Sequence, residues 1–217
     1  MIEDKLLDTL CWNDYDWEDE HVPSYAADFE TTTVADDCRV WAWAVCEVGR
    51  PDDLQYGNSI ESFIEWCNVH AGSRVYFHNL KFDGKFILSY ILQNGWKWIP
   101  VKEECGPQKF TTLISDMGQF YSIKLWFAEN ASIEFLDSLK IIPLPISAIP
   151  KAFGLDIQKL DLDYVEYREV GHVLTPEEKE YISHDVQIAA QALDIMHTQG
   201  MTKMTAGSNA FKEYTKS

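Results

Sequence analysis

Two carboxylates lie two residues apart at the end of an apolar segment. Asp28 and Glu30 close a predicted strand that begins at Ser24, and Phe29 separates them. Side chains alternate along a strand, so both acids project to one face while Phe29 points into the core. Neighbouring anions repel each other unless a cation lies between them, and hard oxygen ligands suit Mg²⁺ or Mn²⁺. The alternative for this pair taken alone is two solvated acids at a strand end.

A further acid follows a predicted middle strand. That strand leads through His78 and Asn79 into a helix whose first turn carries Asp83. The helix dipole also favours an acid there, which is a purely structural alternative. Phe82 and Phe86 lie four residues apart on the same helix, and they are either core residues or platforms on which unpaired bases stack. Their position beside His78 and Asn79 indicates a nucleotide cleft.

The last acid of interest lies inside a long predicted helix. Tyr181 and Asp185 are four residues apart and share a helix face. Asp185 stands at the edge of an apolar stripe, where a lone carboxylate needs a partner. Taken together, the acids of the three segments can converge on two cations about 4 Å apart, which would clamp the attacking and leaving oxygens of a phosphoryl displacement. A tyrosine one turn before Asp185 could hold the attacking water, so the pattern favours phosphodiester hydrolysis.

These residues need elements to position them. Hydrophobic periodicity predicts strands over 24–29, 39–48, 74–77, 110–115, 119–127 and 132–136, with helices over 59–70, 82–94 and 149–153. Ser59 is a predicted helix N-cap, and Thr175, Pro176 and Glu178 predict a capping box that opens a helix running to about His197. Alternating strands and helices predict one mixed-sheet α/β domain.

Composition excludes several classes of protein. The 217 residues carry a formal net charge of -17, which excludes a basic, sequence-independent coat for nucleic acid. The five cysteines form no C-x-x-C pair, so we expect reduced thiols rather than a disulfide framework or a zinc site. The apolar runs are too short to cross a bilayer, and the acidic N-terminus is wrong for a signal peptide. We expect a cytoplasmic protein without membrane contact.

Residues 1–22 form a separate acidic zone. Trp12 and Trp17 lie there within a dense block of Asp and Glu. The zone is either a solvated acidic extension or a segment that binds a protein partner or imitates the charge of nucleic acid. Both interpretations stay open at this point.

The three acid segments resemble motifs I, II and III of a known exonuclease family. Asp28–Thr33, Phe77–Gly84 and the Tyr181/Asp185 pair are similar to those of the protein-primed family-B DNA polymerases of small tailed bacteriophages. The resemblance covers about residues 24–212, and it includes segments 37–42, 137–140, 175–178 and 204–208. It implies a ribonuclease-H-like (DnaQ-like) fold, in which helices flank a mixed central sheet, and a 3′→5′ proofreading exonuclease that uses two divalent ions, Mg²⁺ or Mn²⁺.

Site roles follow from that resemblance position by position. It implies that the metal-binding acids are Asp28, Glu30, Asp83 and Asp185, that Tyr181 orients the water, and that Lys159 supports catalysis. It also implies that the single-stranded primer end is gripped by Thr31, His78, Asn79, Phe82, Phe86, Ser138, Leu139 and Tyr164.

We therefore expect a metal-dependent 3′→5′ exonuclease that hydrolyses single-stranded DNA or frayed 3′ ends to nucleoside 5′-monophosphates. No segment resembles the polymerase metal motifs, so we expect no DNA synthesis by this chain. The expected domains are an acidic extension (1–22), the exonuclease (23–200) and a tail (201–217) where a polymerase region would start. The expected setting is the cytoplasm of a bacterial host, with the gene in a phage or prophage. The alternative is a non-catalytic module that binds replication proteins or other proteins through its acidic surface. RNA as the preferred substrate also stays open.

Overall fold

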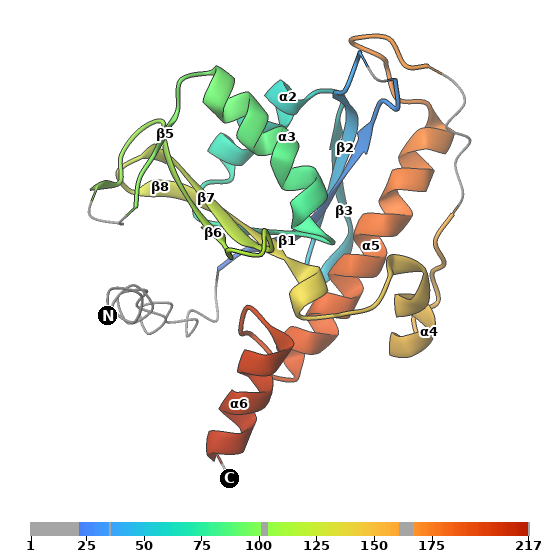
Figure 1. Cartoon of the computed structure of the whole chain (residues 1–217). Helices are drawn as coiled ribbons and strands as arrows, with labels where there is room; N and C mark the ends of the chain where they lie inside the picture. The colour runs from blue at the N-terminus through green and yellow to red at the C-terminus, as the bar shows by residue number, and fades with distance from the viewer. Residues whose placement is uncertain (1–21, 35, 101–103, 161–166, 217) are drawn as a thin grey trace.

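The computed structural model describes residues 22–34, 36–100, 104–160 and 167–216. Within them, one mixed eight-stranded sheet runs through the molecule in the order β3-β2-β1-β4-β8-β7-β6-β5 (Figure 1). The strands are β1 (Ser24–Thr31), β2 (Val40–Glu47), β3 (Arg50–Gly57), β4 (Arg74–Phe77), β5 (Lys97–Trp98), β6 (Lys109–Ile114), β7 (Phe120–Ala128) and β8 (Ala131–Asp137). The predicted mixed α/β architecture is confirmed.

The central strands β1, β4 and β8 are parallel to one another. Tyr25 of β1 pairs with Val75 of β4, which in turn pairs with Phe135 of β8. The carboxyl ends of parallel strands meet at one edge of the sheet, where open α/β sheets commonly bind their ligands. The residues that follow these three strands are therefore brought to one place.

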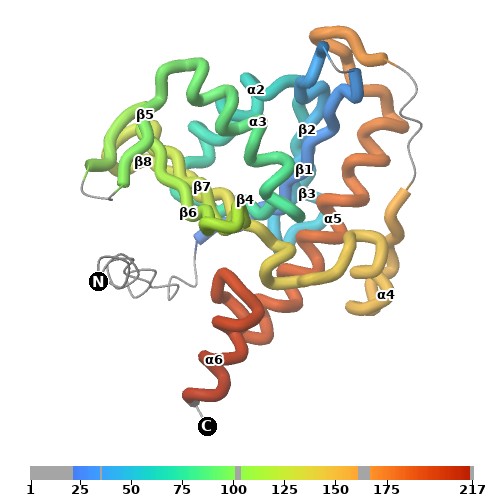
Figure 2. Tube along the Cα trace, viewed as in Figure 1, coloured from blue at the N-terminus to red at the C-terminus, as the bar shows by residue number. Residues whose placement is uncertain are grey.

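Helices cover both faces of the sheet. The helices α2 (Ile60–Val69) and α3 (Leu80–Gln93) pack on one face, where Phe63, Ile87 and Ile91 share a core with Phe29 and Phe77. The helices α4 (Ile149–Phe153) and α5 (Pro176–Thr198) pack on the other face, and α5 lies along β1, β2 and β3 (Figure 2). Two short 3₁₀ helices, η3 (Ser138–Lys140) and η4 (Ile146–Ala148), connect β8 to α4. The sheet thus separates two apolar cores.

Both predicted helix starts are confirmed. The Ser59 side chain accepts a hydrogen bond from the Ser62 N–H at the start of α2. At α5 the Glu178 N–H donates to Thr175 Oγ1 (3.2 Å) and the Thr175 N–H donates to Glu178 Oε2 (3.0 Å). This reciprocal pair is the predicted capping box.

Two strands and one α-helix were not predicted. The strand β3 contains Pro51, Asp52 and Gly57, residue types that usually indicate a turn, but an edge strand tolerates them because one side needs no pairing. The strand β5 has only two residues. Ala206–Lys216, inside the predicted tail, forms the helix α6, which points away from the sheet (Figure 1). None of the described helices has the length and apolar character that a membrane span requires.

Candidate active site

The two acids of β1 lie on the face that carries α5. Ala26 belongs to the core beneath α5, whereas Phe29 packs against Phe63 and Phe77 on the opposite face. Strand alternation therefore places Asp28 and Glu30 with Ala26. Burial and the charge of Asp185 raise the pKa of Asp28 to about 7, although the Lys159 ammonium acts in the opposite direction. A shift of this kind indicates carboxylates gathered out of water.

Asp83 reaches the same place from the other side of the sheet. It lies in the first turn of α3, which begins after Asn79, and Asn79 adopts the left-handed conformation (φ 81°) that asparagine tolerates better than most residues. The Asp83 side chain is buried, with 3% of its surface exposed. Burial first, and then the charge of Asp28, raise the pKa of Asp83 well above its ordinary value, and Glu30 adds to this effect. The three acids are thus electrostatic neighbours.

The third segment contributes from α5. Asp185 is buried, and its Oδ2 atom accepts a hydrogen bond from the Lys159 ammonium. The same ammonium lies 5.6 Å from the centre of the Tyr181 ring. The structure therefore brings together Asp28, Glu30, Asp83, Asp185, Tyr181 and Lys159 from four separate segments of the chain.

Two carboxylate oxygens in this cluster are unpaired. Asp83 Oδ1 and Asp185 Oδ1 are buried and find no hydrogen-bond partner among the described residues. A buried anionic oxygen without a partner is costly, and divalent cations prefer such hard oxygen ligands. Within the described part of the chain, no three His, Cys, Asp or Glu side chains are placed so that they could hold a metal ion together. The unpaired oxygens and the chemistry of the donors nevertheless fit a divalent cation.

The residues predicted to grip the single-stranded primer end divide into two groups. His78 and Ser138 build the wall of the site, because His78 Nδ1 lies 3.0 Å from Ser138 Oγ and His78 Nε2 donates to the Leu144 carbonyl at 2.7 Å. Burial lowers the pKa of His78, which favours the neutral ring, and a neutral ring that carries its proton on Nε2 can make both contacts. Ser138 is itself buried. Both ring nitrogens of His78 are thus held within the protein.

Other predicted contacts face outward. Phe82 is half exposed (50%), and its ring lies 5.7 Å from that of Phe86, which packs partly into the core. Thr31 follows an irregularity in the β1–β2 pairing, and both it and Leu139 are half-buried. Tyr164 lies outside the described residues. Of the two phenylalanines, Phe82 is the one that presents a free ring face.

The sequence analysis assigned no role to Asp137. This buried acid ends β8, and its Oδ1 atom accepts from the Asn79 N–H at 3.1 Å and from the Leu139 N–H at 3.0 Å. One carboxylate thereby ties the start of α3 to the start of η3. The available signal was an Asp directly before Ser at a predicted strand end, a pattern typical of local capping.

The chain is similar in sequence to known DNA polymerases of phages. Residues 69–174 match the family described as DNA polymerase type B, organellar and viral. The chain is 45% identical over 194 residues to the DNA polymerase of Bacillus phage Nf and 41% identical over 201 residues to that of Bacillus phage phi29. These alignments cover 88% and 90% of the chain but only 33% and 34% of the two polymerases.

Solved structures agree with the sequence relatives. Phi29 DNA polymerase complexed with single-stranded DNA superposes with a TM-score of 0.83 at 40% identity, over 88% of this chain and 34% of that one. Its primer-template complex gives 0.85 at 39% identity, over 90% of this chain and 35% of that one. The ribonuclease-H-like fold is thereby confirmed. By sequence and by fold, the chain is similar to the type-B DNA polymerases of phages over most of its own length, and it spans about a third of the length of these relatives.

Proposed function

We propose that the acid cluster hydrolyses the terminal phosphodiester at the 3′ end of single-stranded DNA or of a frayed duplex and releases nucleoside 5′-monophosphates. The observation that carries the proposal is the convergence of four acids beside Lys159 and Tyr181. Three of the acids are buried, and two of these have unpaired oxygens. The solved relatives support the choice of substrate, because phi29 DNA polymerase is seen complexed with single-stranded DNA.

The acids Asp28, Glu30, Asp83 and Asp185 would hold two divalent cations, Mg²⁺ or Mn²⁺. When bound, such ions polarise a phosphoryl oxygen and lower the pKa of water. Their charge would also offset the burial and the mutual repulsion that raise the pKa values of Asp28 and Asp83. A positive site at this edge further lets a chain of net charge -17 accept a phosphate.

The side chains around the acids have roles of their own. In the proposed reaction a water oxygen attacks phosphorus and the water gives up a proton to solvent. The P–O3′ bond breaks, and the departing O3′ takes a proton from solvent. Tyr181 is buried one helical turn before Asp185, so its hydroxyl can orient the attacking water. The Lys159 ammonium holds Asp185 in place and adds positive charge where negative charge develops.

A labelled oligonucleotide tests the proposal. Single-stranded DNA carrying a 5′ label is incubated with the protein in Mg²⁺, in Mn²⁺ and in EDTA, and the products are separated on a gel. We expect a ladder that shortens from the 3′ end and requires the cation. A folded protein that gives no ladder with either cation would contradict the proposal.

Cation binding should also appear as added stability. A ligand that binds only the folded state at a hundred times its Kd stabilises a protein by about 2.7 kcal/mol, which corresponds to a rise in Tm of roughly 5–10 °C for a chain of this size. Thermal unfolding with and without Mn²⁺ measures this rise. The Asp28→Ala/Glu30→Ala variant should lose it, and an equal rise in that variant would place the cation elsewhere.

Phe82 should act as a stacking platform for a base. Replacing it by alanine removes an exposed ring, and base–aromatic stacking is worth about 1–3 kcal/mol, so we expect KM for single-stranded DNA to rise roughly 5- to 150-fold with Tm unchanged. Leu92→Ala is the matched control, because Leu92 is equally exposed (57%) on the same helix, farther along α3. Equal KM values for the two variants would exclude the stacking role.

A further inference from the structure

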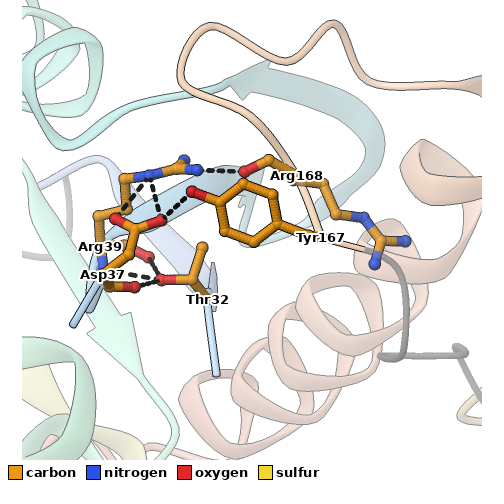
Figure 3. Close-up of polar contacts among 5 residues, drawn as sticks. All are labelled: Thr32, Asp37, Arg39, Tyr167 and Arg168. Atoms are coloured by element: carbon orange, nitrogen blue, oxygen red, sulfur yellow. Dashed lines mark hydrogen bonds and ion pairs between the residues drawn. The ribbon is translucent and has the colours of Figure 1, made fainter. Parts of the chain in front are cut away.

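A polar clamp joins two segments that lie about 130 residues apart in the sequence. It consists of Thr32, Asp37 and Arg39 on one side and of Tyr167 with the Arg168 carbonyl on the other (Figure 3). The first side continues directly from β1, which ends at Thr31. Its two arms are joined by the Thr32 N–H, which donates to the Arg39 carbonyl at 2.9 Å. The second side precedes α5. We call this set the Arg39 clamp.

The Arg39 guanidinium is the centre of the clamp. Its Nε atom lies 3.0 Å from Asp37 Oδ1 and 3.1 Å from Oδ2, and its Nη2 atom donates to the Arg168 carbonyl. The Tyr167 hydroxyl donates to Asp37 Oδ2 at 2.6 Å, so Asp37 accepts from both sides of the junction. A planar fork with several fixed donors suits this task, which the compact ammonium of lysine performs poorly.

The clamp fixes one end of the stretch that carries Lys159. Before Lys159, the Gln158 carbonyl accepts a hydrogen bond from His184 Nδ1 of α5 at 2.6 Å. Residues 161–166 lie outside the described part of the chain, and directly after them Tyr167 and Arg168 are held by the clamp. Lys159 itself reaches Asp185 between these two anchors. The same clamp begins at Thr32, two residues after Glu30, so it ties both sides of the acid cluster together.

We propose that Asp37, Arg39 and Tyr167 are positioning residues that hold Lys159 against Asp185 and the acid cluster. The proposal rests on the proposed exonuclease function, since Lys159 is expected to support catalysis there. None of the three residues belongs to the acid cluster. We assign their effect on turnover to Lys159, and a Lys159→Ala background separates that route from one through Glu30.

A double-mutant cycle tests this coupling. Tyr167→Phe removes one hydroxyl and leaves the ring, and Arg39→Gln removes the guanidinium. We expect each to lower kcat about ten- to a hundredfold, because small misplacements of catalytic groups have effects of this size, while KM stays within about twofold. In a Lys159→Ala background the same substitutions should lower kcat by less than about twofold. Equal losses in both backgrounds would overturn the proposal.

The matched control is Arg50→Gln. Arg50, the first residue of β3, forms an exposed ion pair with Glu47, the last residue of β2 (Nη1–Oε2 3.2 Å). Its replacement removes the same charge from the surface, and we expect kcat to stay unchanged. A loss of kcat like that of Arg39→Gln would show that the effect is one of net charge and would overturn the proposal.

A measurement without activity separates this proposal from the exonuclease function. The ammonium of an ion-paired lysine exchanges its protons slowly enough to give a nitrogen–proton NMR signal, and Lys159→Arg identifies the signal of Lys159. We expect that signal in the metal-free wild type and its loss in Tyr167→Phe. A signal that persists in Tyr167→Phe contradicts the clamp whatever the activity, and its loss in a chain without nuclease activity supports the clamp while the exonuclease proposal fails.

Discussion

Alanine at both Asp28 and Glu30 is expected to lower nuclease turnover at least about a thousandfold while the chain stays folded. The double variant removes half of the acids proposed to hold the cations, and cation stabilisation of the transition state is worth several kcal/mol, with each 1.4 kcal/mol equal to a factor of ten. Folding should not suffer, because the raised pKa of Asp28 shows that the fold disfavours its charged form. The metal-free variant should melt at or above the wild-type Tm.

The control for this variant is Asp52→Ala/Asp53→Ala. These adjacent acids are exposed on β3, so the control loses the same charge without touching the cluster. The rate of release of 5′-monophosphates from single-stranded DNA and the Tm are measured for all three proteins. Wild-type turnover in Asp28→Ala/Glu30→Ala would contradict the assignment of the site.

Glu178→Ala is expected to give the largest loss of stability. The buried Glu178 carboxylate accepts from Arg168 Nε at 3.0 Å and from His172 Nε2 at 2.7 Å, and it completes the capping box with Thr175. Breaking a buried ion pair typically costs about 3–5 kcal/mol, which corresponds to a fall in Tm of roughly 6–20 °C for a chain of this size. The same helix carries Tyr181 and Asp185, so we also expect turnover to fall.

This stability should depend on pH in a defined direction. Burial raises the pKa of Glu178, but the Thr175 N–H, His172 and Arg168 outweigh it and lower the pKa below its ordinary value of 4.5. A carboxylate whose pKa is lower in the folded state stabilises the fold above the unfolded pKa and loses that contribution as the pH falls through the folded pKa. The difference between wild type and Glu178→Ala should therefore be full at neutral pH and shrink below pH 4.5.

Glu177→Ala is the matched control for both results. Glu177 occupies the same first turn of α5 but is exposed. Urea unfolding at several pH values compares the three proteins. If Glu178→Ala matched Glu177→Ala at neutral pH, the anchoring role of Glu178 would be wrong.

Local signals were sufficient for most of the elements. Phe29 alternates with Asp28 and Glu30 because a strand alternates, and Thr175 and Glu178 form a capping box because their spacing fits one helical turn. These relations involve neighbours in the sequence, so the sequence displays them. Two of the three acid segments meet because β1 and β4 are parallel neighbours whose carboxyl ends share one edge of the sheet, and Asp185 reaches them from α5.

Contacts between segments that lie far apart in the sequence could not be predicted from local sequence patterns. The bond from Arg39 to the Arg168 carbonyl joins residues 129 positions apart, and nothing in either neighbourhood indicates it. The contact of His78 with a single-stranded primer end stays a prediction. The hold on its ring by Ser138 and the Leu144 carbonyl depends on how β4 and β8 lie together, which no local pattern indicates. The edge strand β3 was missed because its stability comes from pairing with β2 rather than from its own residues.

The most direct test of the account follows the oxygen of water into the product. Single-stranded DNA is digested in ¹⁸O-enriched water with Mg²⁺ or Mn²⁺, and the released nucleotides are identified by mass spectrometry. We predict nucleoside 5′-monophosphates that carry one ¹⁸O on phosphorus and appear in order from the 3′ end. Release of 3′-monophosphates, or no nucleotide from a folded protein that binds the cation, would contradict hydrolysis by the acid cluster of Asp28, Glu30, Asp83 and Asp185.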